Sequence, residues 1–168
     1  MDLSTKTDDQ INQMIANYER APGGRDLPQY PILLEERARR AQLTQKLNLE
    51  KSMEQLKTTA RGGACITYGD LAKASGVEWS QARHQMNGAN GHLDRLLDLC
   101  HARGLPLLTA ICVNQAGVST GELGEDALAG FATGARRPGL LVTDLRAFHH
   151  RCRDECWAWG KTQVGAAS

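Results

Sequence analysis

The chain has 168 residues, of which 41% are hydrophobic and 23% are charged, a composition that fits one globular domain and excludes a disordered chain. Its 20 Lys and Arg against 19 Asp and Glu leave a net charge of +1, which excludes a polybasic protein that binds nucleic acid by charge alone. No apolar run is long enough to cross a membrane, and the first residues lack the charged-then-apolar order of a secretory signal. We therefore expect a cytoplasmic protein with no membrane partner.

The first 60 residues predict a helical arm. Residues 8–20 carry apolar side chains at helical spacing after two aspartates, which indicates an amphipathic helix. Residues 21–31 contain three of the five prolines and a glycine pair, so they predict a linker. Residues 32–60 contain neither glycine nor proline and predict one long helix. A second apolar stripe starts at Leu43 and Leu47, which leaves a kink or break in that helix as an alternative.

The rest of the chain predicts a compact domain that is mainly α with a small β-sheet. In chain order we expect an extended step at 66–67, helices over 68–74, 79–87 and 91–102, a strand over 107–113, a loop over 115–124, a helix over 125–131, a second strand at 140–142 and a helix over 143–159. This order is typical of a winged-helix domain. We thus expect a winged-helix-like domain preceded by an N-terminal helical arm, with the divisions 1–31, 32–60, 61–160 and a flexible tail over 161–168.

Three segments of this domain carry a more specific resemblance. They are Ile66-Thr67-Tyr68-Gly69-Asp70-Leu71-Ala72, Ala82-Arg83, and Ile111-Cys112-Val113-Asn114-Gln115-Ala116-Gly117. Together they resemble the DNA-binding domain of alkylguanine-DNA alkyltransferases and their alkyltransferase-like relatives. In that family a tyrosine presses on a phosphate to rotate a nucleotide outward, and an arginine fills the vacated stack. The resemblance implies these roles for Tyr68 and Arg83, and a guanidinium can occupy such a gap.

The reactive motif of that family, Pro-Cys-His-Arg, is missing here. Thr109 stands at the cysteine position and Ala110 at the histidine position. Alkyl transfer needs a thiolate activated by a neighbouring base, so we expect no enzyme and no cofactor. Cys112 lies three residues further on, and strand alternation predicts that it faces the core if Thr109 faces a pocket.

The residues expected to contact nucleic acid lie on the predicted recognition helix and beside it. They are Thr67, Tyr68, Trp79, Gln81, Arg83, His84, Asn87 and Asn114. The structural alternatives are a half-buried ring for Tyr68 and a solvated helix face for Arg83. The predicted wing contains no Lys or Arg.

The five cysteines are odd in number and irregularly spaced, which predicts free, mostly buried thiols. His149, Cys152 and Cys156 would share one helical face, a spacing that suits zinc, with His101 or Cys100 as a fourth ligand. The same cysteines also belong to an apolar stripe, and free cysteine behaves as a small hydrophobe. We adopt the apolar interpretation and expect no metal.

A second resemblance concerns the setting of the protein. The segment Gly104–Asn114 is similar to a segment in bacterial proteins of mobile elements and defence loci, some of which carry HNH nuclease modules. No His-Asn-His arrangement follows it here. The resemblance therefore implies a bacterial or phage defence setting without an activity.

These observations predict a non-enzymatic nucleic-acid-binding protein of alkyltransferase-like type, with DNA as its partner. The alternative is a subunit of a larger complex whose N-terminal helices bind another protein or a second copy of the chain. Near-neutral charge, the uncharged wing and a helix with two apolar stripes favour that alternative.

Overall fold

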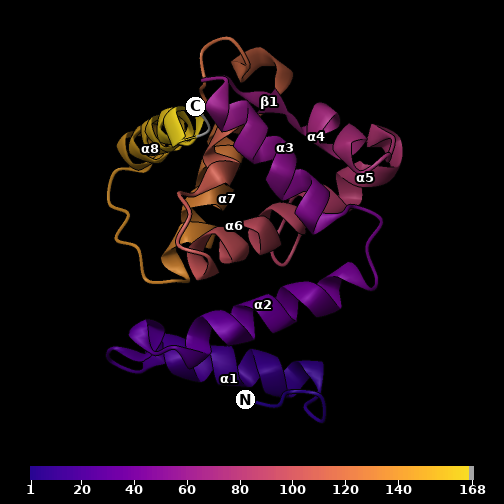
Figure 1. Ribbon diagram of the computed structural model, residues 1–168, viewed down its shortest axis with the longest axis vertical. Coiled ribbons are helices and arrows are strands. Elements are labelled where there is room, and N and C mark those ends of the chain that lie inside the picture. Colours follow the sequence, from indigo (N-terminus) through magenta and orange to yellow (C-terminus); the bar gives the residue numbers. More distant parts are fainter. Residues whose placement is uncertain (167–168) are drawn as a thin grey trace.

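In the computed structural model, which describes residues 1–166, the chain is mainly helical with one small parallel sheet (Figure 1). The expected class, mainly α with a small β-sheet, is confirmed. None of the described helices is long and apolar enough to cross a membrane. The elements are α1 (Asp8–Arg20), η1 (Gly24–Asp26), α2 (Gln29–Gln42), α3 (Leu49–Arg61), β1 (Ile66–Thr67), α4 (Tyr68–Ala74), α5 (Trp79–Met86), α6 (His92–Ala102), η2 (Leu108–Ile111), β2 (Cys112–Val113), η3 (Gln115–Gly117), α7 (Glu125–Arg136) and α8 (Leu145–Ala166).

Helices α1 and α2 form the arm, and α2 lies between α1 and α6 (Figure 1). The predicted helix over 8–20 is confirmed. It begins at a capping box, in which the Thr7 hydroxyl accepts a hydrogen bond from the Gln10 amide at 3.2 Å and the Gln10 side chain accepts one from the Thr7 amide at 2.8 Å. The arm has a small core of its own, formed by Leu3, Ile11, Ile15, Tyr30, Leu33 and Leu34.

The single long helix predicted over 32–60 is wrong, because α2 ends at Gln42 and α3 begins at Leu49. Asn48 caps α3, and the Gln42 side chain bridges the gap by donating to the Leu47 carbonyl at 2.9 Å. Leu47 is fully buried, so the break places this residue of the second apolar stripe in the main core, whereas Leu43 stays 75% exposed. Helix α2 also starts inside the predicted linker, with Pro31 in its first turn, where no intrahelical amide bond is lost.

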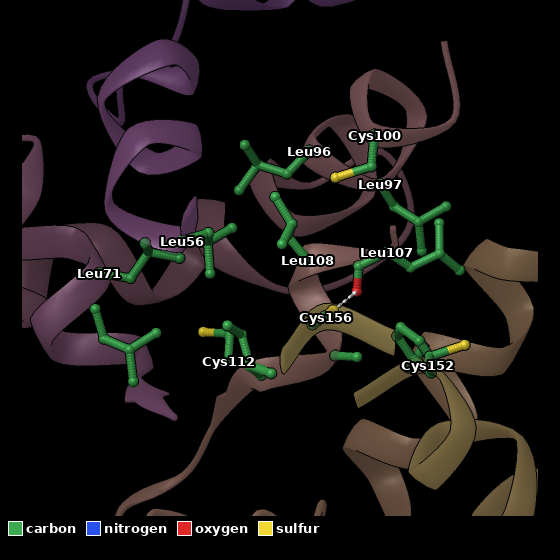
Figure 2. Close-up of a cluster of buried hydrophobic side chains, with 14 of the residues drawn as sticks. Leu56, Leu71, Leu96, Leu97, Cys100, Leu107, Leu108, Cys112, Cys152 and Cys156 are labelled. Carbon is green, nitrogen blue, oxygen red and sulfur yellow. Dashed lines mark hydrogen bonds between the residues drawn. The ribbon is translucent and has the colours of Figure 1, made fainter. Parts of the chain in front are cut away.

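Helix α3 is at the centre of the main core and contacts α4, α6, η2 and α8. Met53 and Leu56 are fully buried there, so a segment expected in the arm shares its core with the later helices. Figure 2 shows Leu56 and its leucine neighbours from α4, α6 and η2 together with four cysteines. All five cysteines are free, and four of them are buried, as predicted.

The sheet pairs Ile66 with Cys112 and Thr67 with Val113 in parallel. The strand predicted over 107–113 is mostly wrong, since Leu108–Ile111 form the 3-10 helix η2. Helices α3, α6 and α8 surround this segment, so its backbone groups are satisfied locally rather than by a partner strand, as in the bond from the Ala110 amide to the Leu107 carbonyl at 2.9 Å. Residues 140–142 pair with no strand in the described part of the chain, which corrects that prediction.

The last two helices are longer than predicted. Helix α7 continues beyond residue 131 to Arg136, and α8 spans Leu145–Ala166 instead of 143–159. Gly160 allows α8 to cross the end of α3, because a Cβ there would lie 2.2 Å from the Ala60 carbonyl oxygen. The predicted tail over 161–168 is helical up to Ala166, and its last two residues lie outside the described ones.

Candidate functional site

A cavity of about 680 Å³ lies where η2, β2, α6 and α7 approach the end of α5. Three of the residues predicted to contact nucleic acid line it, namely Tyr68, Asn87 and Asn114. Thr109, at the position of the missing reactive cysteine, lines the same cavity. These four residues come from different elements and loops, so only the folded chain brings them together.

Tyr68 begins α4, and Thr67 caps that helix by accepting a hydrogen bond from the Asp70 amide at 3.1 Å. The Tyr68 ring stacks on Trp79 of α5, with ring centroids 6.3 Å apart and planes 18° apart. Burial raises the pKa of Tyr68 to about 12, so the phenol is neutral and able to donate a hydrogen bond. Trp79 remains 39% exposed, so part of its ring next to Tyr68 faces solvent.

Helix α5 holds the remaining predicted contacts away from the cavity. Ala82 and Met86 bury one side of the helix, while Gln81, Arg83 and His84 are exposed. Among the described residues, Arg83 forms no ion pair. The structure therefore divides the predicted residues into a cavity group and an exposed group on α5, with Trp79 stacked on Tyr68 of the cavity group and Thr67 serving as a helix cap.

Cys112 is 1% exposed and belongs to the main core, as predicted. It also lines the cavity beside Thr109, because 108–111 is a 3-10 helix and the alternation of a strand does not apply. Thr109 is 5% exposed, and its hydroxyl has no hydrogen-bond partner among the described residues. Burial raises the pKa of the Cys112 thiol far above its usual value, so it is protonated.

The cavity also contains charges that sequence reasoning missed. Asp94, Glu125 and Asp126 line it together with Arg137, whose Nη2 lies 3.3 Å from the Asp94 carboxylate. Glu125 and Asp126 occupy the first turn of α7, where acidic residues are common because they favour a helix start. Their position in the sequence therefore gave no signal of a cavity.

The possible zinc ligands on α8 lie in different surroundings. Cys152 and Cys156 are buried in the apolar core, where the Cys156 thiol donates to the Leu107 carbonyl at 3.3 Å (Figure 2). Burial raises the pKa of Cys152 to about 12, which disfavours the thiolate that zinc requires. His149 is fully buried, with Nε2 lying 2.8 Å from the Ala110 carbonyl oxygen.

A different group, with two histidines of α8 and one residue of the loop before α7, offers three ligand atoms within 4.8 Å of one another, from Glu122, His149 and His150. The Glu122 carboxylate already accepts a hydrogen bond from Arg146 at 2.9 Å and lies 3.5 Å from the Arg153 guanidinium. Two guanidinium groups at this distance repel a metal cation. The group is better described as an ion-pair cluster that attaches the loop before α7 to α8.

No protein-family model matches this chain, and searches of curated proteins and of solved structures gave no significant match. The resemblance to alkyltransferases therefore rests on the motifs of residues 66–117. The geometry adds that Tyr68, Thr109 and Asn114 line one cavity.

Proposed function

We propose that this chain is a non-enzymatic DNA-binding protein that holds an extruded nucleotide base in the cavity at the end of α5. The observation that carries the proposal is the shared cavity of Tyr68, Asn87, Thr109 and Asn114. Its volume of about 680 Å³ falls in the usual range for sites that hold a small organic group. The apolar lining, with a few polar groups, suits the face and edge of a base.

The exposed face of α5 supports the proposal from outside the cavity. Arg83 and His84 point to solvent close to Asn87, which lines the cavity. Lys46 lies beside α5, because its backbone amide donates a hydrogen bond to the Gln85 side chain at 3.2 Å, and its own side chain is exposed. A small group of cations is enough for phosphate contacts in a protein of near-neutral charge, and binding through it is salt-dependent.

A titration of labelled duplex and single-stranded DNA at two salt concentrations tests this function. We expect binding at low salt that weakens as salt rises, because phosphate contacts release counterions. Arg83→Ala is expected to weaken binding by about tenfold, the usual worth of one good guanidinium contact. The matched control is Arg151→Ala, an exposed arginine on α8. Failure of both DNA forms to bind at low salt would contradict the proposal.

The absence of alkyl transfer is a separate part of the proposal. Cys112 is the thiol in the cavity, and its burial holds it in the unreactive protonated form. We expect no transfer of a methyl group from O6-methylguanine DNA to the protein. Intact-mass spectrometry after incubation measures this directly, and a stoichiometric methyl adduct on Cys112 would show that the chain is an enzyme.

A second function, protein binding by the arm, is favoured by one observation. A groove of about 780 Å³ runs between the N-terminal residues, α2 and the end of α6. Two apolar side chains in it are exposed, Ile32 at 45% and Leu43 at 75%. If the groove binds a protein or a second copy, Leu43→Glu reduces assembly in sedimentation velocity, whereas Leu141→Glu, at an exposed leucine outside the groove, leaves assembly unchanged. Equal assembly of all three proteins would reject self-association through this groove.

A further inference from the structure

The charge of the cavity lining points to a particular class of base, on the premise of the proposed function. Three carboxylates line the cavity, from Asp94, Glu125 and Asp126, against one guanidinium, from Arg137. Asp94 and Arg137 offset each other at 3.3 Å. Glu125 and Asp126 are exposed and form no ion pair with any other described residue. The cavity therefore presents an excess of negative charge to whatever enters it.

This excess of negative charge disfavours a phosphate group in the cavity and favours a base that carries positive charge. A negative group would meet two uncompensated carboxylates, whereas a positive one would be attracted by them. The start of α7 offsets part of the carboxylate charge, so the attraction is modest rather than strong.

The other lining groups suit a flat, polar-edged cation. The aromatic rings of Tyr68 and Phe131 line the cavity, and such rings attract cations through their electron-rich faces. Thr109, which is 5% exposed, contributes a buried hydroxyl that has no partner among the described residues. A buried hydroxyl without a partner favours a ligand that brings a hydrogen-bonding atom to it.

We propose that the cavity selects an extruded base that carries a positive charge, as a purine alkylated on a ring nitrogen does. Alkylation at such a nitrogen gives the ring a positive charge while its other ring nitrogens keep their protons, whereas an unmodified purine is neutral. Because Thr109 stands where a reactive thiol would be needed, the protein holds the damaged base without changing it.

The test compares two duplexes of the same sequence, one with a single 7-methylguanine and the other with guanine at that position, with a 2′-fluoro sugar to prevent loss of the base. We expect the methylated duplex to bind about fivefold more tightly at low salt, which is the effect of two partly screened carboxylates. The double variant Glu125→Gln/Asp126→Asn is expected to bind both duplexes equally. The matched control, Asp154→Asn/Glu155→Gln, changes two consecutive exposed acidic residues of α8 that do not line the cavity. This control is expected to keep the preference for the methylated duplex.

The possible outcomes separate this inference from the function it rests on. Equal binding of both duplexes by the unmodified protein overturns the charge selection and leaves DNA binding intact. A preference that survives in the Glu125→Gln/Asp126→Asn variant also overturns it. Binding of neither duplex contradicts DNA binding itself, and titration with free 7-methylguanosine then shows whether the cavity holds the cation alone. If 7-methylguanosine does not bind either, both the proposed DNA binding and the selection of a cationic base are rejected.

Discussion

The N-terminal arm and the cavity differ in what their polar groups do. In the arm, Arg40 donates to Glu36, to Asp8 and to two backbone carbonyls, so its donors are used within the protein. Around the cavity, Glu125 and Asp126 are unpaired among the described residues and the Thr109 hydroxyl has no partner. Polar groups that are satisfied internally hold a structure, whereas unsatisfied groups beside a cavity are available to a ligand.

The two regions meet at one buried carboxylate. Asp98 of α6, which is 2% exposed, lies 2.8 Å from Arg37 of α2, 3.4 Å from Arg95 and 3.9 Å from Arg137 of the cavity. It is therefore a counter-ion shared by the arm and the cavity, so a substitution of Asp98 should affect both regions.

The largest effect is expected from Asp98→Ala. This change leaves three guanidinium groups near one another without their common carboxylate, and removing one partner of a buried ion pair costs about 4 kcal/mol. Denaturant unfolding measures the loss, with Asp154→Ala, at an exposed ion pair, as the control. A loss below about 1 kcal/mol would show that the carboxylate does not hold the arm and the cavity together.

Acid is expected to act on the main core before it acts on the arm. Burial lowers the pKa of His92 from 6.5 to about 4, and its Nε2 lies 2.8 Å from the Ser52 hydroxyl. Below pH 6.5 the unfolded chain binds a proton at His92 that the folded chain excludes. The contribution of neutral, buried His92 to the free energy of unfolding is therefore complete above pH 6.5 and is lost as the pH falls towards about 4. In the arm, hydrogen bonds from Arg39 and Arg40 lower the pKa of Glu36 to about 2, so its contribution persists to lower pH.

The measurement is the free energy of unfolding between pH 7 and pH 4. Protonation of His92 alone should lower this free energy by about 3 kcal/mol over that range. His92→Gln should flatten that dependence. Glu36→Gln should lower the free energy of unfolding by a constant amount above the usual pKa of 4.5 and alter its pH dependence only below that value. An unaltered slope in His92→Gln would place the acid sensitivity elsewhere.

The smallest effect is expected at the surface between the arm and the core. Arg103 at the end of α6 joins Glu35 of α2 at 2.8 Å and Glu50 of α3 at 2.6 Å. These carboxylates are partly solvated, so Arg103→Ala should cost about 1 kcal/mol or less, and the cost should shrink as salt rises. Hydrogen exchange should report faster opening of α1 and α2 in this variant. Unchanged exchange there would show that the ion pairs contribute nothing to docking of the arm.

The sequence predicted most helices because their capping residues and apolar stripes are local signals. The two aspartates before the apolar stripe of 8–20 marked the start of α1, and the helix predicted from residue 68 begins there as α4. The break at Asn48 and the 3-10 helix at Leu108–Ile111 depend on packing against distant helices, which no local pattern records. A run of apolar residues fits either a strand or a buried 3-10 segment.

The candidate site was predictable to a similar extent. Tyr68 and Asn114 were chosen from the motif segments and Asn87 from the predicted recognition helix, and all three line the cavity. Glu125 and Asp126 were not chosen, because acidic residues in a first turn have an ordinary helical explanation and only the tertiary structure places them at the cavity.

The central claim is that the cavity holds a base taken out of a duplex, and the fluorescence of 2-aminopurine tests it most directly. This base is quenched while stacked in DNA and brightens when it is extruded. We expect fluorescence to rise when the protein binds a duplex that contains it, and to remain quenched with Thr109→Phe, which fills the cavity, although α5 still binds the DNA. Circular dichroism and the melting temperature check that this variant is folded. DNA binding without any rise in fluorescence, or an equal rise with the folded Thr109→Phe variant, would contradict the account.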